Sequence, residues 1–247
     1  MRRGSSTSVV PLLFFTRKEQ TIKIQKFGVD KDIAKPVITV GVAASLLQVM
    51  TLVQQLVLYN TASKYGGDNL MILIGAASKV QSFSFIPLWG MSQALQPAVG
   101  TNYGAQNYDR VKKINNVFML GSFVLIMVLW VPIQLLPSQI LGMFITDPAI
   151  VAEGINGFRV MFSILPALGV LILSMTFFQS LGKGTQASIL VILRQLLLFV
   201  PLALILPRFV GAFGVWLAVP LTDGIVLVMS IAFIVGAYKK IGLEKRR

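Results

Sequence analysis

The sequence contains neither cysteine nor histidine, and only nine of its 247 residues are aspartate or glutamate. The missing cysteines exclude thiol nucleophiles and disulfides, and the missing histidines exclude histidine proton relays. Together the two absences remove the common zinc and haem ligand sets. Most of the acids lie outside the apolar runs, so paired carboxylates are scarce, and no candidate nucleophile has a base to activate it. We therefore expect neither an enzyme nor a bound cofactor.

Charge is also scarce, because charged residues make up 13% of the chain whereas hydrophobic residues make up 55%, and the mean hydropathy is +0.77. A soluble domain usually carries about 25% charged residues. The apolar runs are long enough to cross a hydrocarbon core of about 30 Å, which takes roughly 20 helical residues. These features predict an all-α integral membrane protein with lipid as its surroundings.

Six membrane spans are predicted from the hydropathy of the chain. The breaks between them carry the Gly, Pro, Asn and Asp residues typical of turns, as in "KYGGDN", "NYGAQNYDR", "TDPA", "LGKG" and "PRFVGAFG". The predicted spans are 36–60, 70–96, 114–136, 157–181, 186–206 and 213–238.

The basic residues account for the net charge of +13 and predict an orientation. If the N-terminus is cytoplasmic, 17 of the 22 lysines and arginines lie on the inner side, whereas only Lys64 and Arg208 lie in outer loops. Lysine and arginine concentrate in cytoplasmic segments, so both termini should be cytoplasmic and no nucleic-acid partner is needed to explain the charge. The predicted organisation is a cytoplasmic basic segment over 1–35, a six-helix bundle over 36–238 and a basic cytoplasmic tail over 239–247.

Two of the predicted spans carry polar residues on one side, as judged from the 3.6-residue helical repeat. On the first span these residues are Gln48, Thr51, Gln55 and Tyr59. On the second span they are Lys79, Ser82, Gly90, Gln93 and Pro97. These faces line a solvent-filled cleft in one interpretation and form hydrogen-bonded contacts between helices in the other. The lysine favours the cleft for the second span.

Two charges are predicted deep in the membrane. Arg194 lies about 12 Å from the inner end of the fifth span, and Asp223 lies about 15 Å from the outer end of the sixth. The two spans run in opposite directions, so these residues should sit at similar heights. Asp223 is then either the acid of an ion pair with Arg194 or a site for a proton or a cation, and the ion pair is slightly favoured.

Two blocks of sequence carry a resemblance to a known family. Residues 65–113 include "GMSQALQPAVGTNYGAQNYDRVKK", and residues 177–223 include "FFQSLGKGTQ", "LRQ", "GVW" and "PLTD". In this order, and with "MFITDP" between them, they resemble the second half of transporters of the multidrug and toxic compound extrusion (MATE) family. The resemblance covers about residues 30–240.

The resemblance implies a fold and a function. The chain would be a six-transmembrane-helix bundle equivalent to the second lobe of a twelve-helix MATE transporter in the plasma (inner) membrane. Such a protein is an antiporter that exports cationic or amphiphilic drugs or metabolites in exchange for H+ or Na+. Substrate and ion would pass the polar and charged residues already singled out. These are Gln48, Thr51, Gln55, Lys79, Ser82, Gln93, Arg194 and Asp223.

The chain departs from the family pattern because it has six predicted spans where such transporters have twelve. Its start, "SVVPLLFFTRKEQ", looks like the end of the last span of a missing first half. We therefore expect its partner to be an N-terminal six-helix half or a second copy of itself. Two alternatives are half of a related flippase for lipid-linked precursors and an inactive truncated product. The flippase is disfavoured, since a pyrophosphate usually needs several bases and only Lys79 and Arg194 lie deep.

Overall fold

The computed structural model describes the backbone of residues 31–244 and the side chains of residues 48–239 and 241, and these described residues form helices and short turns without a strand. The chain divides into two compact units, Met1–Leu46 and Leu47–Arg247. The described part of the first unit, residues 31–46, is helical. The predicted basic segment over 1–35 and the end of the tail after 244 lie largely outside the described residues.

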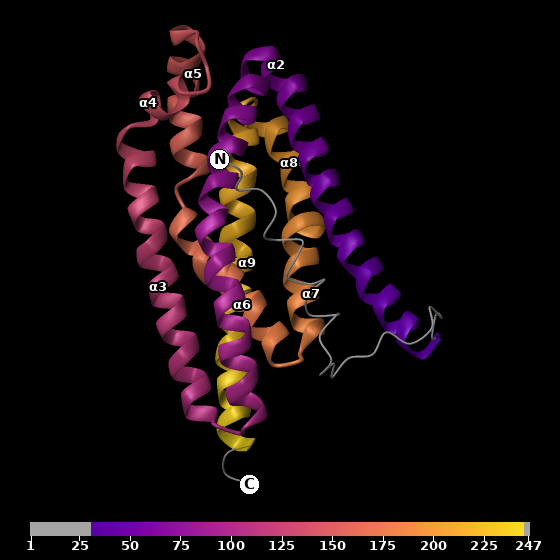
Figure 1. Ribbon diagram of the computed structural model, residues 1–247. Coiled ribbons are helices and arrows are strands. Elements are labelled where there is room, and N and C mark those ends of the chain that lie inside the picture. Colours follow the sequence, from indigo (N-terminus) through magenta and orange to yellow (C-terminus); the bar gives the residue numbers. More distant parts are fainter. Residues whose placement is uncertain (1–30, 245–247) are drawn as a thin grey trace, which may run out of the picture. The chain divides into compact units, whose positions relative to one another are not determined.

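Gly67 divides the first described helix, α2 (Lys31–Gly104), into two arms. Its φ of +63° and ψ of −156° are not helical, and Figure 1 shows the reversal of the chain at this point. Glycine adopts this backbone conformation without the steric cost that a side chain would impose. The turn predicted at "KYGGDN" is therefore present, and the two arms correspond to the first two predicted spans.

The other predicted spans also appear as helical rods (Figure 1). The bounds of the remaining elements are α3 (Tyr108–Leu135), α4 (Pro137–Gly142), α5 (Pro148–Met161), α6 (Leu165–Ser180), α7 (Gly184–Ile192), η1 (Leu193–Leu198), α8 (Phe199–Val210) and α9 (Phe213–Glu244). Four helices of the described chain, α2 among them, are long and apolar enough to cross a membrane, and the bent pair α5 and α6 would be a fifth. The all-helical membrane fold predicted from the sequence is thus confirmed.

Several helices differ in detail from the predicted spans. Helices α3 and α9 extend beyond the apolar segments at 114–136 and 213–238, because polar residues continue a helix after it leaves the hydrocarbon region. The predicted fourth span is broken between α5 and α6, which are bent by 45°. The predicted fifth span contains η1, a π-helix, between α7 and α8.

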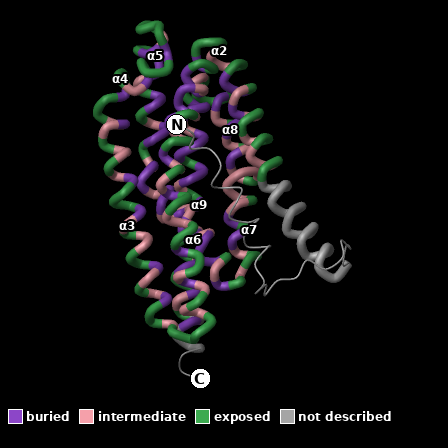
Figure 2. The backbone as a smooth tube through the Cα atoms, viewed as in Figure 1, coloured by how far each residue is buried: buried purple, intermediate pink, exposed green. Residues whose placement is uncertain are grey.

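The second unit buries its apolar side chains in two clusters. One contains Leu73, Phe158 and Trp216, and the other contains Leu95 and Phe177. Small residues allow close helix contacts: a side-chain carbon added at Gly157 would collide with the indole of Trp216. Figure 2 shows exposed positions along α3, where Leu120 and Val128 are among the exposed apolar residues. Such a face is suited to lipid.

Candidate functional site

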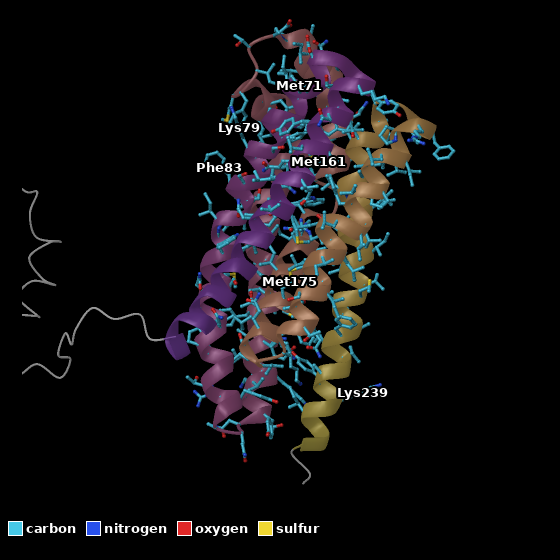
Figure 3. The ribbon with its side chains drawn as sticks, turned by 90° about the vertical axis from the view of Figure 1, so that its right-hand side faces the viewer. Met71, Lys79, Phe83, Met161, Met175 and Lys239 are labelled. Atoms are coloured by element: carbon cyan, nitrogen blue, oxygen red, sulfur yellow. The ribbon has the colours of Figure 1, made fainter. Side chains whose placement is uncertain are left out.

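The second unit contains a cavity of about 560 Å³ between both arms of α2, α6, α7, η1 and α9. Met175 is one of its lining residues and lies along the middle part of the bundle in Figure 3. The residues that line the cavity are Thr51, Gln54, Gln55, Leu58, Ser78, Gln81, Ser82, Phe85, Trp89, Ser92, Gln93, Gln96, Ile172, Met175, Thr176, Gln179, Val191, Arg194, Gln195 and Val219.

Amide side chains dominate the polar part of this lining. The seven lining glutamines are Gln54, Gln55, Gln81, Gln93, Gln96, Gln179 and Gln195. Each amide offers both donors and acceptors for hydrogen bonds. Serine and threonine hydroxyls add further donors and acceptors, and Phe85 and Trp89 contribute aromatic rings one helical turn apart. Among the described residues that line the cavity, Arg194 is the only charged one.

The π-helix η1 carries two of these polar side chains, Arg194 and Gln195. A π-helix is rare and is often found where a helix contributes to a functional site. The amide nitrogen of Gln195 donates to Thr51 Oγ1 at 3.1 Å and so joins η1 to the first arm of α2. The other amide atom, Gln195 Oε1, is buried and has no hydrogen-bond partner within the described chain. Gln195 therefore serves in this wall as a link between η1 and the first arm of α2.

Arg194 is paired with Asp223 of α9, as one of the two interpretations of the sequence predicts. Arg194 Nε lies 2.7 Å from Asp223 Oδ1, and Nη2 lies 3.4 Å from Oδ2. Asp223 is only 3% exposed and is not among the lining residues, whereas its partner is. The guanidinium carbon also lies 5.8 Å from the centre of the Phe85 ring. The pair therefore presents its cationic side to the cavity and buries its anionic side.

The polar residues of α2 both line the cavity and form hydrogen bonds between helices, which are the two interpretations that the sequence left open. Thr51 accepts a hydrogen bond across helices from Gln195, and Ser92 is hydrogen-bonded to Thr176 of α6 at 2.6 Å. Gln55 and Gln93, in contrast, line the cavity with exposed side chains. The hydrogen bonds fix the helices around the cavity, and the exposed amides give it a polar surface.

Five of the eight pathway residues named from the sequence line this cavity, namely Thr51, Gln55, Ser82, Gln93 and Arg194. Asp223 lies behind Arg194, and the exposed residue Gln48 is outside the lining. Lys79 is not among the residues that line the cavity. Its amine lies 5.7 Å from the centre of the Phe144 ring, and Figure 3 shows Lys79 toward the Gly67 end of the bundle. A long lysine side chain can carry its charge along a helix to a wetter position.

The lining also includes residues that the sequence interpretation did not single out. Gln54 and Gln81 are next to predicted residues in the sequence, but the helix faces considered for the two spans did not include them. Gln179 and Gln195 lie in the "FFQ" and "RQ" motifs, where they served only to identify the family resemblance. Grouping glutamines across all spans would have identified these four positions.

Comparisons with known proteins agree with this architecture. The MatE family model matches residues 42–205. The chain is 21% identical over 236 residues to Multidrug export protein MepA of Staphylococcus haemolyticus, covering 95% of this chain and 52% of that protein. It is 26% identical over 162 residues to a FAD transporter of Shewanella oneidensis, covering 64% of this chain and 34% of that protein.

A solved structure shows the same fold. A crystal structure of MATE in the bent conformation superimposes with a TM-score of 0.83 and 21% identity, covering 97% of this chain and 54% of the other. The chain thus spans about half the length of this structure and of the staphylococcal relative.

Proposed function

The chain belongs to the MatE family, and on this basis we propose that it forms one six-helix lobe of a secondary active antiporter. The assembled transporter would export amphiphilic drugs or metabolites, cationic compounds among them, in exchange for H+ or Na+. The names of the relatives support a role in transport, and the fold supports a membrane-embedded lobe.

The observation that carries the proposal is the amide-lined cavity within an otherwise apolar bundle. Its volume of about 560 Å³ lies in the range of pockets that hold drug-sized molecules. Polar side chains are costly in hydrocarbon and usually mark a pathway for substrate or ions. The exposed apolar side chains of α3 contrast with this polar interior and are suited to contact with lipid.

The membrane in which the chain lies and the coupling of export to H+ or Na+ are part of the same proposal. The concentration of 17 lysines and arginines on one side of the predicted spans favours a cytoplasmic location of both termini, and membership of the family favours the plasma membrane. Asp223 is the acid nearest to the cavity among the described residues of the membrane spans, so it would respond to an inward flow of H+ or Na+ if this lobe takes part in coupling.

The flippase alternative loses one of its two deep bases. A lipid pyrophosphate would need several cations in the cavity, but the amine of Lys79 lies over Phe144 and only Arg194 remains in the lining. The antiporter is therefore the better supported of the two.

The lobe should require a second six-helix bundle, because alternating access needs one repeat to rock against another. We expect a missing N-terminal half, or a second copy of the chain, to cover the polar face of α2. The experiment is efflux of a fluorescent amphiphile from cells that co-express this chain with the first half of a related transporter.

Filling the cavity distinguishes transport through this lobe from transport by the partner. Gln93→Phe should reduce efflux by about tenfold or more, because the ring occupies space needed by substrate. Val128→Phe on the exposed face of α3 is the matched control and should leave efflux unchanged. Equal efflux from both variants would refute the assignment of this cavity to the pathway.

A further inference from the structure

A second cavity of the second unit, with a volume of about 300 Å³, lies beside α9 and apart from the amide-lined cavity. Phe178 lines this second cavity, whereas the next residue of α6, Gln179, lines the amide-lined one. Successive residues point in different directions around a helix, so the two cavities lie on different sides of α6. We call the second cavity the α9 groove. Its lining residues are Phe178, Lys183, Gln186, Ala232, Phe233, Gly236 and Ala237.

The α9 groove has an aromatic wall and an open apolar side. The rings of Phe178 and Phe233 meet edge to face with their centres 6.3 Å apart, and Phe178 is buried. Ala232 and Gly236, which are one turn apart on α9, are exposed. Val235, between them in the sequence, is an exposed apolar residue. The groove therefore opens on a side of α9 that is suited to contact with lipid.

Lys183 brings a positive charge to the α9 groove. It is half-buried and lies in the turn between α6 and α7, where the sequence predicts that the chain leaves the membrane. Lys239 follows Gly236 by three residues, and Figure 3 shows its side chain near the C-terminal end of α9, pointing away from the bundle. In the described part of the chain no acid lines the groove, and neither lysine is paired with a carboxylate. The groove therefore offers positive charge that the described residues do not compensate.

We propose that the α9 groove binds an anionic glycerophospholipid. The phosphate lies against the amine of Lys183 and the amide of Gln186, which donate hydrogen bonds to its oxygens. One acyl chain follows the apolar groove past Phe233 and Gly236, and the rest of the lipid stays in the bilayer. A lipid bound in this way contacts α6, α7 and α9 together and stabilises the folded chain by mass action. The proposal goes beyond the transport function and requires only the membrane fold.

The size and the charge of the groove favour this class of ligand. A volume of about 300 Å³ is at the lower limit of pockets for drug-sized molecules, and such pockets usually bury most of the ligand's surface. Because Ala232 and Gly236 are exposed, the groove covers only part of a ligand, which suits a lipid that the bilayer also holds. A zwitterionic lipid would bring its own ammonium group near Lys183 and Lys239, whereas a headgroup with a net negative charge avoids this repulsion.

Native mass spectrometry of the purified full chain in detergent measures the binding of individual lipids. The probes are palmitoyl-oleoyl phosphatidylglycerol and the phosphatidylcholine with the same acyl chains. The first phosphatidylglycerol should bind about tenfold more tightly than the first phosphatidylcholine, and it should raise the melting temperature at a lower concentration. Equal affinity for the two lipids would overturn the proposal. Glycerol phosphate has the charge without the acyl chains, so displacement of the lipid by an equal concentration of it would assign the groove to a soluble phosphate compound instead.

Two charge variants separate the groove from a general attraction of anions to the basic end of the bundle. Lys183→Gln removes the charge from the groove at similar length and should weaken phosphatidylglycerol by about fivefold. Lys113→Gln removes an exposed base of α3 that does not line the groove and should leave this affinity nearly unchanged. An equal loss of affinity in both variants would show a diffuse attraction to the bases and would contradict the proposal.

A third variant fills the groove without disturbing the helix that carries it. A side-chain carbon added at Gly236 meets no atom within 4 Å, and the same is true of Gly75 on α2, which lies outside the groove. Leucine also favours a helix more than glycine does, so both Gly236→Leu and Gly75→Leu should fold, as size-exclusion chromatography would check. Gly236→Leu should weaken phosphatidylglycerol by about tenfold, and Gly75→Leu should not weaken it. Unchanged affinity in folded Gly236→Leu would place the lipid elsewhere and overturn the proposal.

Discussion

Arg194 and Asp223 depend on each other, because each places a charge where water is scarce. Asp223 is 3% exposed, and its two oxygens face two nitrogens of one guanidinium. A bidentate pair of this kind is stronger than a single charged contact. Removing one partner leaves a buried charge without compensation, whereas removing both charges leaves two neutral polar groups.

Asp223→Asn should therefore lower the yield of folded protein, and adding Arg194→Gln should partly restore it. Breaking a buried ion pair costs about 3–5 kcal/mol in soluble proteins, which sets the scale of the loss. Size-exclusion chromatography of detergent-solubilised variants measures the folded fraction. Normal yield of Asp223→Asn together with loss of transport by the assembled transporter would instead assign Asp223 to ion coupling.

Individual residues were predictable from the sequence to different degrees. The Arg194–Asp223 pair was predicted because isolated charges are conspicuous in apolar spans and their depths could be compared. The absence of Lys79 from the lining could not be predicted, because a flexible side chain can move its charge away from the helix face that bears its Cα atom. The hydrogen bond from Gln195 to Thr51 depends on contacts between helices, which periodicity within one helix does not specify.

Helices and turns were easier to predict from the sequence than side-chain contacts. The reversals at Gly67, Gly182 and Gly211 have positive φ and fall within the predicted breaks. Hydropathy and turn residues are sufficient for such features, because they mark where a chain leaves the membrane. The π-helix at 193–198 and the bend between α5 and α6 were not predicted, since neither changes the average hydropathy of its span.

The orientation of these helices remains a prediction and can be tested with introduced cysteines, since the chain has none of its own. Ser138→Cys lies at the start of α4 and should react with an impermeant maleimide in intact cells. Ala105→Cys lies in the exposed turn between α2 and α3 and should react only after the membrane is permeabilised. The opposite pattern would reverse the proposed topology.

The molecule as a whole carries a polar face that its own six spans enclose only in part. Gln55, Ser82 and Trp89 line the cavity and are exposed in the isolated chain. Composition predicts a membrane bundle but cannot reveal that the bundle matches about half the length of its relatives. That relation came from two ordered sequence blocks, and the comparison structure supports it because only 54% of its chain is covered.

The most direct test of the account is gradient-driven transport by the chain with and without a second bundle. The purified 247-residue chain is reconstituted into liposomes alone, and in parallel with a six-span first half from a relative. A pH or Na+ gradient is imposed, and movement of a fluorescent amphiphile is followed. The account predicts no transport against a gradient by the chain alone and measurable transport by the pair. Sustained transport by the chain alone would contradict it and would identify a functional homodimer.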